Sequence, residues 1–593
     1  MSGASAALRA WILMFVVGVS GAAWGQVSPF TAVEFEEDGT LMVTLDGERV
    51  ALVLLGGVPT AELIAGAKRE FGDDWQKRIG EDLLEVFEAL EVELDSEDVI
   101  DVVIFRDGEF VEVMDAPMTR DNRQLVWEHN RVVREREQLG LAGDVLGSLV
   151  EIIRDRHAYA TLRGVDLDAI VAKERERLGD RPSVDALRLA GQRIVSALGD
   201  GHARVDGWDD SFPRGRLPFL LVAAGEGVVA IENDRSALVD PEHPYVESID
   251  GVPLERWIDA ASVYVAAGSP QLVRERSLRL IRYVNFVRGE LGLVASSDVS
   301  LKLRSATGGT AEVERRVTPV RGIYGTWPLT TSRMMEGDIG YFRLPSMSPE
   351  SRGLPSELWR RQLRDELALV TRGAAGLIID VRGNGGGLRD PIFAIMPSLM
   401  ERGSEPVVVN AARARIDGFD NRSDPEGFLG NRYLYPAAWS GWSEAERASI
   451  AAFRADFRPE WSTPDDGFSD WHYMVVSPGG DEVVRFEGPV VVLMDDTCFS
   501  ATDIFVGALG ELSSVTLVGT PSAGGSARSR GYEIGPIEVR VASMASYQPN
   551  GRLYDGNGVS PDVIVEKRPG DVVLGGGDAQ LDRAVELLRE SGG

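Results

Sequence analysis

The second half of the chain alternates short apolar segments with segments of helical periodicity. The run Val490 to Met494, for example, is bounded by Gly488-Pro489 before it and Asp495-Asp496 after it. Such segments are typical of strands buried on both faces of a sheet. Their alternation with helices predicts an α/β core with a mostly parallel sheet. The predicted strands of this core start at residues 339, 376, 406, 490 and 515.

Ser500 lies where the strand predicted at 490–494 gives way to a helical pattern over 501–512. The free N–H groups and the positive dipole end of a helix favour negative charge, so a hydroxyl on this turn suits a nucleophile. The same position suits an ordinary N-cap serine. This stretch alone leaves both interpretations open.

A glycine-rich run, residues 383–387, follows the strand predicted to start at residue 376. Glycines let the backbone turn sharply and bring its N–H groups close to a phosphate or an oxyanion. A phosphate loop of the Walker type needs a lysine followed by serine or threonine, whereas this run continues with Leu388, Arg389 and Asp390. The run therefore indicates an oxyanion site or a tight strand-to-helix turn.

The N-terminus has the layout of a secretory signal peptide. Arg9 precedes an apolar run over residues 10–19, and small residues lead to a predicted cleavage site after Gly25. The run is short for a membrane span, and an uncleaved anchor is the alternative. Either interpretation predicts a periplasmic or secreted protein. Cys498 is the only cysteine, which excludes an intramolecular disulfide, and we interpret it as a buried small residue.

The net charge of −31 disfavours nucleic acid and anionic membranes as partners, because either would repel such a surface. We expect no membrane association beyond the N-terminal segment. Asp495 and Asp496, at the end of a predicted strand, are expected to be solvated acids rather than a functional pair. His202 lies in a glycine-flanked turn after a predicted helix, where a lone histidine is usually solvated. The sequence does not predict an oligomeric state.

Pattern changes along the chain predict several domains, as its length of 593 residues suggests. Hairpins are predicted at Asp46-Gly47 and Asp107-Gly108. An aromatic-rich insertion at about 413–481 is either a lid or a surface elaboration. The predicted parts are a signal peptide (1–25), an accessory α/β module (26–120), a helical subdomain (121–205), a PDZ-like β domain with a helical insertion (211–325), the α/β core (330–570) and a C-terminal helix (571–593).

Five segments, in order, resemble the tail-specific (C-terminal processing) peptidase family, which includes the tricorn-protease core. They are IGYFRL, GLIIDVRGNGGG, CFSATDIF, VGTPSAGG and DGNGVSPDVIV, and the resemblance spans roughly residues 122–567. The segment ALGDGHARV, before a PDZ-like part, is similar to the tricorn-like branch. The resemblance implies a crotonase/ClpP-like β-α catalytic core. It also implies a serine endopeptidase that acts on unstructured or C-terminal segments of proteins and needs no metal or organic cofactor.

The resemblance also implies roles for individual residues. Ser500 matches the nucleophile of the family's Ser-Ala-x-Glu pattern, with Asp503 in place of the glutamate. One branch of the family uses a lysine base about 25 residues after the serine. No lysine occurs between Lys302 and Lys567, so a dyad of that kind is excluded. The tricorn-like branch instead implies His202 as the base.

The motif at residues 558–562 implies a supporting acid at Asp555, where glutamate is more usual. Imidazole can take the serine proton near neutral pH, and a carboxylate fixes its tautomer and stabilises imidazolium. A turn aspartate is the alternative role for Asp555. The predicted oxyanion donors are the backbone N–H groups of Ala501, Gly385 and Gly386.

Two non-catalytic functions stay open. Retinoid-binding repeats of the vertebrate eye resemble the same family, and the aspartates at 503 and 555 are compatible with a binding protein on this scaffold. The second non-catalytic function is that of a peptide-binding scaffold in which only the PDZ-like part is active. A distance within about 3.5 Å between Nε2 of His202 and Oγ of Ser500 favours the peptidase.

Overall fold

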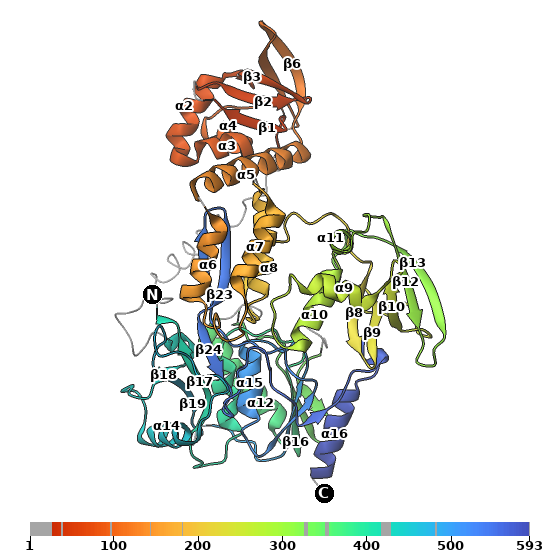
Figure 1. The fold of residues 1–593 in the computed structure, drawn as a ribbon, viewed down its shortest axis with the longest axis vertical. Helices are drawn as coiled ribbons and strands as arrows, with labels where there is room; N and C mark the ends of the chain where they lie inside the picture. Colours follow the sequence, from red (N-terminus) through yellow and green to blue (C-terminus); the bar gives the residue numbers. More distant parts are fainter. Residues whose placement is uncertain are drawn as a thin grey trace, which may run out of the picture. The chain divides into compact units, whose positions relative to one another are not determined.

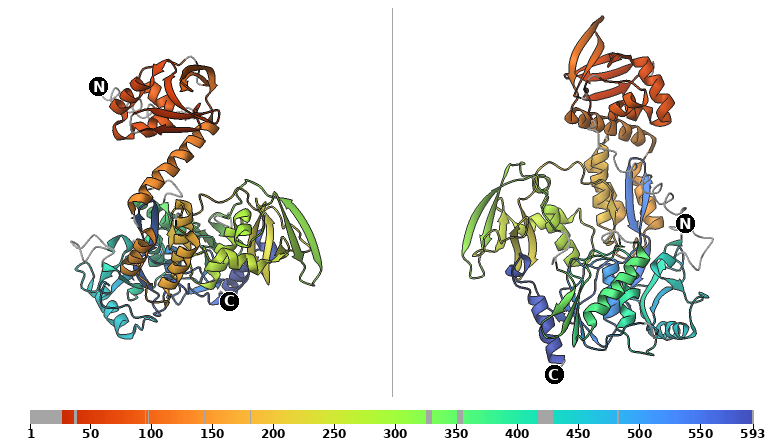
Figure 2. Two further views of the ribbon diagram at one scale, coloured as in Figure 1. Left: turned by 45° about the horizontal axis from the view of Figure 1, so that its top comes forward. Right: turned by 180° about the vertical axis from the view of Figure 1, so that it is seen from behind.

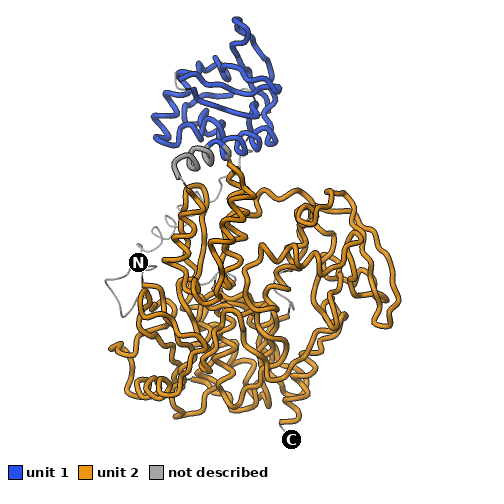
Figure 3. Tube along the Cα trace, in the orientation of Figure 1, with its two compact units in different colours: residues 1–143 blue, residues 144–593 orange. Residues whose placement is uncertain are grey.

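The computed structural model describes residues 27–591, except 37–38, 95, 97, 143, 181, 325–329, 350–354, 417–428 and 481–482. The chain forms two compact units, residues 1–143 and 144–593 (Figure 3). The predicted signal peptide lies outside the described residues. None of the helices within the described ranges combines the length and the apolar character needed to cross a membrane.

An antiparallel sheet forms the centre of the first unit, with strand order β1-β2-β3-β5-β6 and β4 paired with β3 (Figure 1). Asp46-Gly47 and Asp107-Gly108 all have positive φ and make the turns of the two predicted hairpins. The strands are β1 (Ala32–Phe35), β2 (Leu41–Leu45), β3 (Glu48–Leu55), β4 (Val58–Pro59), β5 (Val99–Arg106) and β6 (Glu109–Pro117).

The helices of the first unit bury apolar residues against this sheet, among them Leu63, Val86 and Phe87. The unit extends beyond the predicted boundary at residue 120. Helix α5, which the sequence pattern assigns to the helical subdomain, therefore belongs to the N-terminal unit. The helices are α2 (Thr60–Phe71), η1 (Gly72–Asp74), α3 (Trp75–Glu81), α4 (Leu83–Ala89) and α5 (Arg120–Ala142).

The second unit begins with three amphipathic helices, α6 (Val145–Arg156), α7 (Leu167–Leu178) and α8 (Val184–Ser196). Each is capped at its N-terminus by a side chain, Asp144, Asp166 or Ser183. The chain after α8 passes through the turn that contains His202 and joins a three-stranded sheet. Its strands are β7 (Arg204–Val205), β22 (Ser529–Ile534) and β23 (Ile537–Ala542).

The segment predicted to be PDZ-like forms an antiparallel sheet, with strand order β13-β12-β10-β9-β8, and a helical insertion. The β12–β13 hairpin projects from the rest of the second unit in every view (Figures 1 and 2). The elements are β8 (Phe219–Ala224), β9 (Gly227–Glu232), β10 (Tyr245–Ile249), β11 (Val252–Pro253), α9 (Leu254–Ser262), α10 (Pro270–Ile281), α11 (Val284–Glu290), β12 (Asp298–Arg304) and β13 (Thr310–Arg316).

The main sheet of the second unit confirms the predicted α/β core. Its strand order is β14-β15-β16-β20-β21-β25, and all pairs except β14 with β15 are parallel. The strands are β14 (Arg333–Met335), β15 (Ile339–Arg343), β16 (Gly376–Asp380), β20 (Val490–Met494), β21 (Val515–Gly519) and β25 (Val563–Ile564). The helices that cover the sheet are α12 (Ser356–Thr371), α13 (Asp390–Ile395), α15 (Ala501–Leu509) and α16 (Ala579–Ser591).

Strand β20 is buried on both faces of this sheet, as its apolar run predicts. Val490, Val492 and Met494 join the core formed with α12, α13 and α15. The alternate residues Val491 and Leu493 pack with α16 on the opposite face. Alternation with period two therefore places helices on both sides of the strand that leads to Ser500.

The strand predicted at residue 406 does not join the main sheet. It is β17 (Val407–Ala414), which pairs with β19 (His472–Val476) and β24 (Met544–Tyr547) in a second sheet that also contains β18 (Tyr435–Pro436). The described part of the aromatic-rich insertion thus supplies two strands, together with α14 (Glu444–Asp456). The described part of the unit also contains the short helical turns η3 (Met396–Ser398), η5 (Gly430–Arg432) and η6 (Pro569–Val572).

Candidate active site

Ser500 lies on the tight turn between β20 and α15, at the carboxyl edge of the main sheet. Its φ of 62° is in the left-handed region, which residues other than glycine adopt rarely. The side chain makes no capping hydrogen bond to α15. Instead, Oγ lies 3.2 Å from Nε2 of His202. The serine side chain therefore faces a base and does not cap the helix.

The glycine-rich loop leaves the same edge of the sheet, because β16 and β20 are neighbouring parallel strands. Gly386 has a φ of 99°, and a Cβ there would lie 2.5 Å from the carbonyl oxygen of Phe499 and 2.7 Å from Cβ of Ser500. The amide of Phe499 donates to the carbonyl of Asn384 at 3.2 Å. Glycine is thus required for the close approach of the loop to the serine turn.

One of the predicted oxyanion donors is already engaged. The amide of Gly386 donates to Oδ1 of Asn384 at 2.9 Å, which removes it as a free donor. The amides of Ala501 and Gly385 make no hydrogen bond to any residue that the structure describes. Nδ2 of Asn384 donates to the carbonyl of Leu344 at 3.0 Å, so this buried side chain holds the loop in shape. The sequence analysis missed Asn384, and a polar residue inside a glycine run was the available signal.

His202 is partly buried and held in place by contacts that a solvated loop histidine would lack. Its amide donates to Oδ1 of Asp200 at 2.8 Å. Nη1 of Arg276 donates to the carbonyl of Gly201 at 2.6 Å. The imidazole packs on the ring of Phe499, with centroids 4.5 Å apart. These contacts fix both the turn and the ring that faces Ser500.

Asp555 is fully buried and offers a free carboxylate oxygen beside His202. Its Oδ2 accepts from the hydroxyl of Tyr159 at 2.9 Å and from the amide of Ser526 at 3.0 Å. Its Oδ1 and Nδ1 of His202 are both buried without a hydrogen-bond partner among the described residues. Two unpaired buried groups that can pair with each other favour Asp555 as the acid of the site.

Asp200 is the other acid beside His202, and the side chains of Asp200, His202 and Asp555 have potential ligand atoms within 4.8 Å of one another. Oδ1 of Asp200 accepts from the amide of His202 at 2.8 Å, and Oδ2 accepts from the amide of Ala542 at 2.6 Å. The carboxylate of Asp200 is therefore held by two backbone amides, and its Oδ2 also lies 3.4 Å from Nε2 of His157.

The charges of these groups are set by their surroundings. Removal from water lowers the pKa of His202 to about 4; the negative charge of Asp200 opposes this shift, and the positive charges of Arg276, Arg432 and Arg204 add to it. Burial and then the negative charge of Asp200 raise the pKa of Asp555 to about 7. The imidazole is thus neutral at neutral pH, as a general base must be.

The family model described as peptidase family S41 matches residues 338–565. Residues 338–565 are thus similar to peptidase family S41, and we call them the S41 domain. The match includes Ser500, the glycine-rich loop and Asp555, whereas His202 precedes it. The resemblance to this family that the sequence indicates is confirmed for this domain.

Relatives of the S41 domain are found among known proteins and solved structures. The carboxy-terminal-processing protease of Bartonella bacilliformis (strain ATCC 35685 / KC583 / Herrer 020/F12,63) is 32% identical over 234 residues, 39% of this chain and 40% of that protein. The match thus spans two fifths of the length of this curated relative. The crystal structure of mature CPAF has a TM-score of 0.52 at 17% identity, over 76% of this chain and 96% of that chain. CPAF complexed with lactacystin has a TM-score of 0.51 at 16% identity, over 76% and 98%. These structures share the fold.

Asp503, which replaces the expected glutamate in the S41 domain, orders the loop after β21. Its Oδ1 accepts from the hydroxyl of Ser522 at 2.5 Å and from the amide of Gly524 at 2.9 Å, and its Oδ2 accepts from the amide of Gly525 at 3.1 Å. The next residue is Ser526, whose amide holds Asp555. Asp503 therefore supports the position of Asp555 through this loop.

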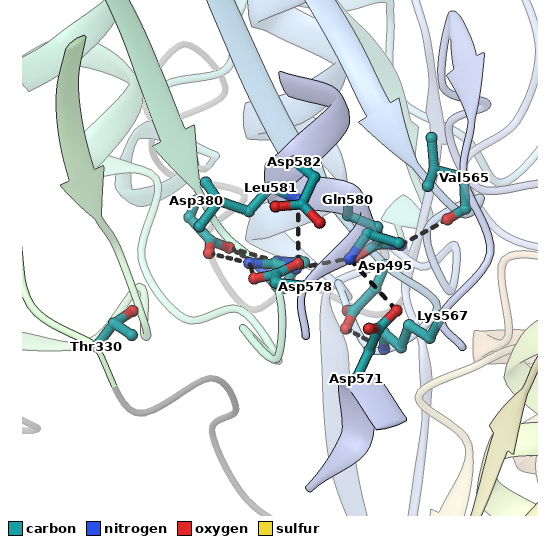
Figure 4. Close-up of polar contacts among 12 residues, drawn as sticks. Thr330, Asp380, Asp495, Val565, Lys567, Asp571, Asp578, Gln580, Leu581 and Asp582 are labelled. Atoms are coloured by element: carbon teal, nitrogen blue, oxygen red, sulfur yellow. Dashed lines mark hydrogen bonds and ion pairs between the residues drawn. The ribbon is translucent and has the colours of Figure 1, made fainter. Parts of the chain in front are cut away.

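The expectation that Asp495 is solvated is wrong, because the residue is only 2% exposed. Oδ1 accepts from the amides of Gly383 and Thr497, each at 3.1 Å, and so joins the glycine-rich loop to the turn before Ser500. Nζ of Lys567 lies 2.7 Å from Oδ2 and neutralises the carboxylate (Figure 4). Cys498, in the same turn, is buried as predicted.

Proposed function

We propose that the chain is an exported serine endopeptidase that hydrolyses unstructured or C-terminal segments of proteins. Ser500 is the nucleophile, His202 is the general base and then the general acid, and Asp555 orients His202. The proposal is carried by the 3.2 Å distance between Nε2 of His202 and Oγ of Ser500, on a turn where the serine does not cap its helix. That distance is within the reach a general base needs.

The reaction starts from neutral His202. Nε2 takes the proton of Ser500 while Oγ forms a bond to the carbonyl carbon of the peptide. The C–N bond then breaks, and the imidazolium gives its proton to the leaving amine. Water deprotonated by His202 hydrolyses the acyl-enzyme in the same way. The low pKa of His202 supports this role, because the base is uncharged in the free enzyme.

Charge that develops on the carbonyl oxygen is proposed to bind the free amides of Ala501 and Gly385. Ala501 begins α15, so the N-terminal dipole of the helix favours the same negative charge. Loss of one such donor typically raises the barrier by about 3 kcal/mol. Gly386 is left out of this set, because its amide donates to Asn384.

The imidazolium that forms during the reaction needs an anion at its other nitrogen. Oδ1 of Asp555 and Nδ1 of His202 lack partners among the described residues, so an N–H at Nδ1 can donate to this oxygen. Hydrogen bonds of catalytic groups are often long in the free enzyme and tighten when substrate binds. We assign the orienting role to Asp555 rather than Asp200, whose oxygens already accept backbone amides.

The substrate class and location rest on sequence features. The relative with 32% identity is named a carboxy-terminal-processing protease, which supports a peptide or protein substrate. A histidine base and the absence of lysine between Lys302 and Lys567 support the tricorn-like branch. The layout of residues 1–25 supports export.

Hydrolysis of an unstructured peptide by the chain without residues 1–25 tests the proposal. We expect the wild type to cleave internal bonds and Ser500→Ala to lose this activity while the melting temperature stays close to that of the wild type. Equal cleavage by the variant would contradict the proposal. The rival, a non-catalytic binding protein, predicts binding without cleavage in both proteins, and the short distance between His202 and Ser500 disfavours it.

A further inference from the structure

Helix α10 of the PDZ-like segment contacts the site from outside the S41 domain. Its capping residue Ser269 donates to the carbonyl of Ala523 at 2.5 Å. Nε2 of Gln271 donates to the carbonyl of Ser522 at 2.7 Å, and Nη1 of Arg276 donates to the carbonyl of Gly201 at 2.6 Å. One helix therefore bonds both the loop that supports Asp555 and the turn that carries His202.

Arg276 makes a second contact, with the aromatic ring next to the nucleophile. Its guanidinium carbon lies 4.6 Å from the centroid of the Phe499 ring, a cation–π distance. The same ring packs against the imidazole of His202, with an interplanar angle of 34°. Phe499 immediately precedes Ser500. Arg276 is thus linked to His202 through the backbone of Gly201 and through the ring of Phe499.

The space around Phe499 leaves its ring little freedom. A Cβ at Gly201 would lie 3.0 Å from Cε2 of Phe499, and a Cβ at Gly525 would lie 2.3 Å from the same atom. Two glycines from separate loops therefore allow the ring to occupy this position. A ring fixed in this way defines where the imidazole can lie.

We propose that Arg276 is a positioning residue, which acts through Gly201 and Phe499 to place Nε2 of His202 against Oγ of Ser500. This inference rests on the proposed function, and it adds a residue from the PDZ-like segment to the machinery of the site. Arg276 does not touch the reacting atoms. Its effect is the alignment of the base, where a displacement of about 1 Å can cost on the order of 100-fold in rate.

The positive charge of Arg276 also affects a second measurable quantity, the pKa of His202. Removal from water is the largest influence on His202, and the nearby guanidinium also disfavours the imidazolium. The other charged groups around the imidazole are Asp200 and Asp555, which favour imidazolium when ionised, and Arg204 and Arg432, which oppose it. Replacement of Arg276 by a neutral residue therefore raises the pKa of His202.

Three variants and a control separate the effect of Arg276 on the alignment of His202 from the effect of its charge. Arg276→Gln keeps a donor but loses the charge, Arg276→Lys keeps the charge but loses the flat guanidinium, and Phe499→Leu removes the ring. Arg274→Gln is the matched control, because Arg274 lies on the same helix and pairs with Glu255 at the surface. The measured quantities are the rate of fluorophosphonate labelling of Ser500 against pH and the titration of His202 by NMR. His202→Ala identifies its signal among those of the five histidines.

We expect Arg276→Gln to label at least about tenfold more slowly and its His202 to titrate at a higher pH than in the wild type. Arg276→Lys should label slowly with the His202 titration unchanged, and Arg274→Gln should match the wild type. Wild-type labelling and titration in Arg276→Gln would overturn the inference. If Arg276→Gln does not fold, Phe499→Leu decides: slow labelling of a folded variant supports the inference, and wild-type labelling overturns it. Absence of labelling in the wild type would count against the proposed function. The NMR titration of His202 tests the inference separately, because it does not require an active enzyme.

Discussion

At the scale of single residues, the charge of Asp555 is the main variable of the site. Its pKa of about 7 means that the carboxylate supports His202 fully only above neutral pH. The expected activity therefore rises as pH increases through about 7.

The raised pKa of Asp555 also affects the stability of the folded protein. Between its unfolded pKa near 4 and its folded pKa near 7, the folded state holds a proton that the unfolded state has released, so Asp555 lowers stability as pH rises across this window.

Asp555→Asn is expected to lower activity and to raise stability at alkaline pH. The amide can donate to Nδ1 of His202, which leaves the proton on Nε2 and blocks the base. Loss of activity on the order of 10⁴-fold is known for such a change in serine proteases. Thermal melting at pH 5 and pH 8 should show a smaller loss of melting temperature between these pH values in the variant than in the wild type. An equal loss in both proteins would contradict the raised pKa.

Gly386→Ala tests the contact between the glycine-rich loop and the serine turn. Its Cβ would lie 2.5 Å from the backbone oxygen of Phe499, in addition to the cost of about 1–2 kcal/mol for a left-handed residue. We expect loss of fluorophosphonate labelling. Gly403→Ala is the matched control, since Gly403 has a φ of 75° with nothing within 4 Å of its Cβ position. A labelling rate for Gly386→Ala equal to that of the control would refute the contact.

At the scale of elements, local patterns predicted most strands and helices but not their partners. The apolar run before Ser500 predicted β20 with correct bounds, because burial on both faces leaves a clear signal. The helical spacing after Ser500 predicted the start of α15 correctly, but the helix ends at Leu509 and not at residue 512. The equally apolar run of β17 joins a different sheet, and nothing in its composition distinguishes it from a core strand. Asp495 was mistaken for a solvated residue because its partner Lys567 lies 72 residues away in the sequence.

The pair of Asp495 and Lys567 is expected to stabilise the edge of the sheet. Lys567→Met leaves a buried carboxylate without its cation, and loss of one partner of a buried pair typically costs about 3–5 kcal/mol. Lys302→Met is the control, since its ion pair with Glu247 is exposed and worth at most about 1 kcal/mol. Denaturant unfolding of the two variants measures the difference. Similar losses in both would argue against a structural role for the buried pair.

At the scale of the whole molecule, the proposed site is assembled from distant parts of the second unit. His202 and Ser500 are 298 residues apart, and Tyr159 and Asp555 are 396 residues apart. The family resemblance predicted Ser500, His202 and Asp555 as a set. It could not predict Tyr159, Asn384 or Arg276, whose contacts depend on tertiary packing and leave no local pattern.

All residues of the proposed site lie in the second unit, so we expect residues 144–593 alone to be labelled at Ser500. This unit has its own hydrophobic cores, which support independent folding. The measurement compares the labelling rate and the melting temperature of this fragment with those of the protein from residue 26 onward. A folded fragment that is not labelled would mean that the first unit contributes to the site.

The central claim is that His202 activates Ser500, and fluorophosphonate labelling mapped by mass spectrometry tests it most directly. Four proteins are compared: the wild type, Ser500→Ala, His202→Ala and the control His243→Ala, whose histidine pairs with Asp240 away from the site. We predict a single modified residue, Ser500, in the wild type and the control, and loss of labelling in the other two. Labelling at another residue, or undiminished labelling of His202→Ala, would contradict the account.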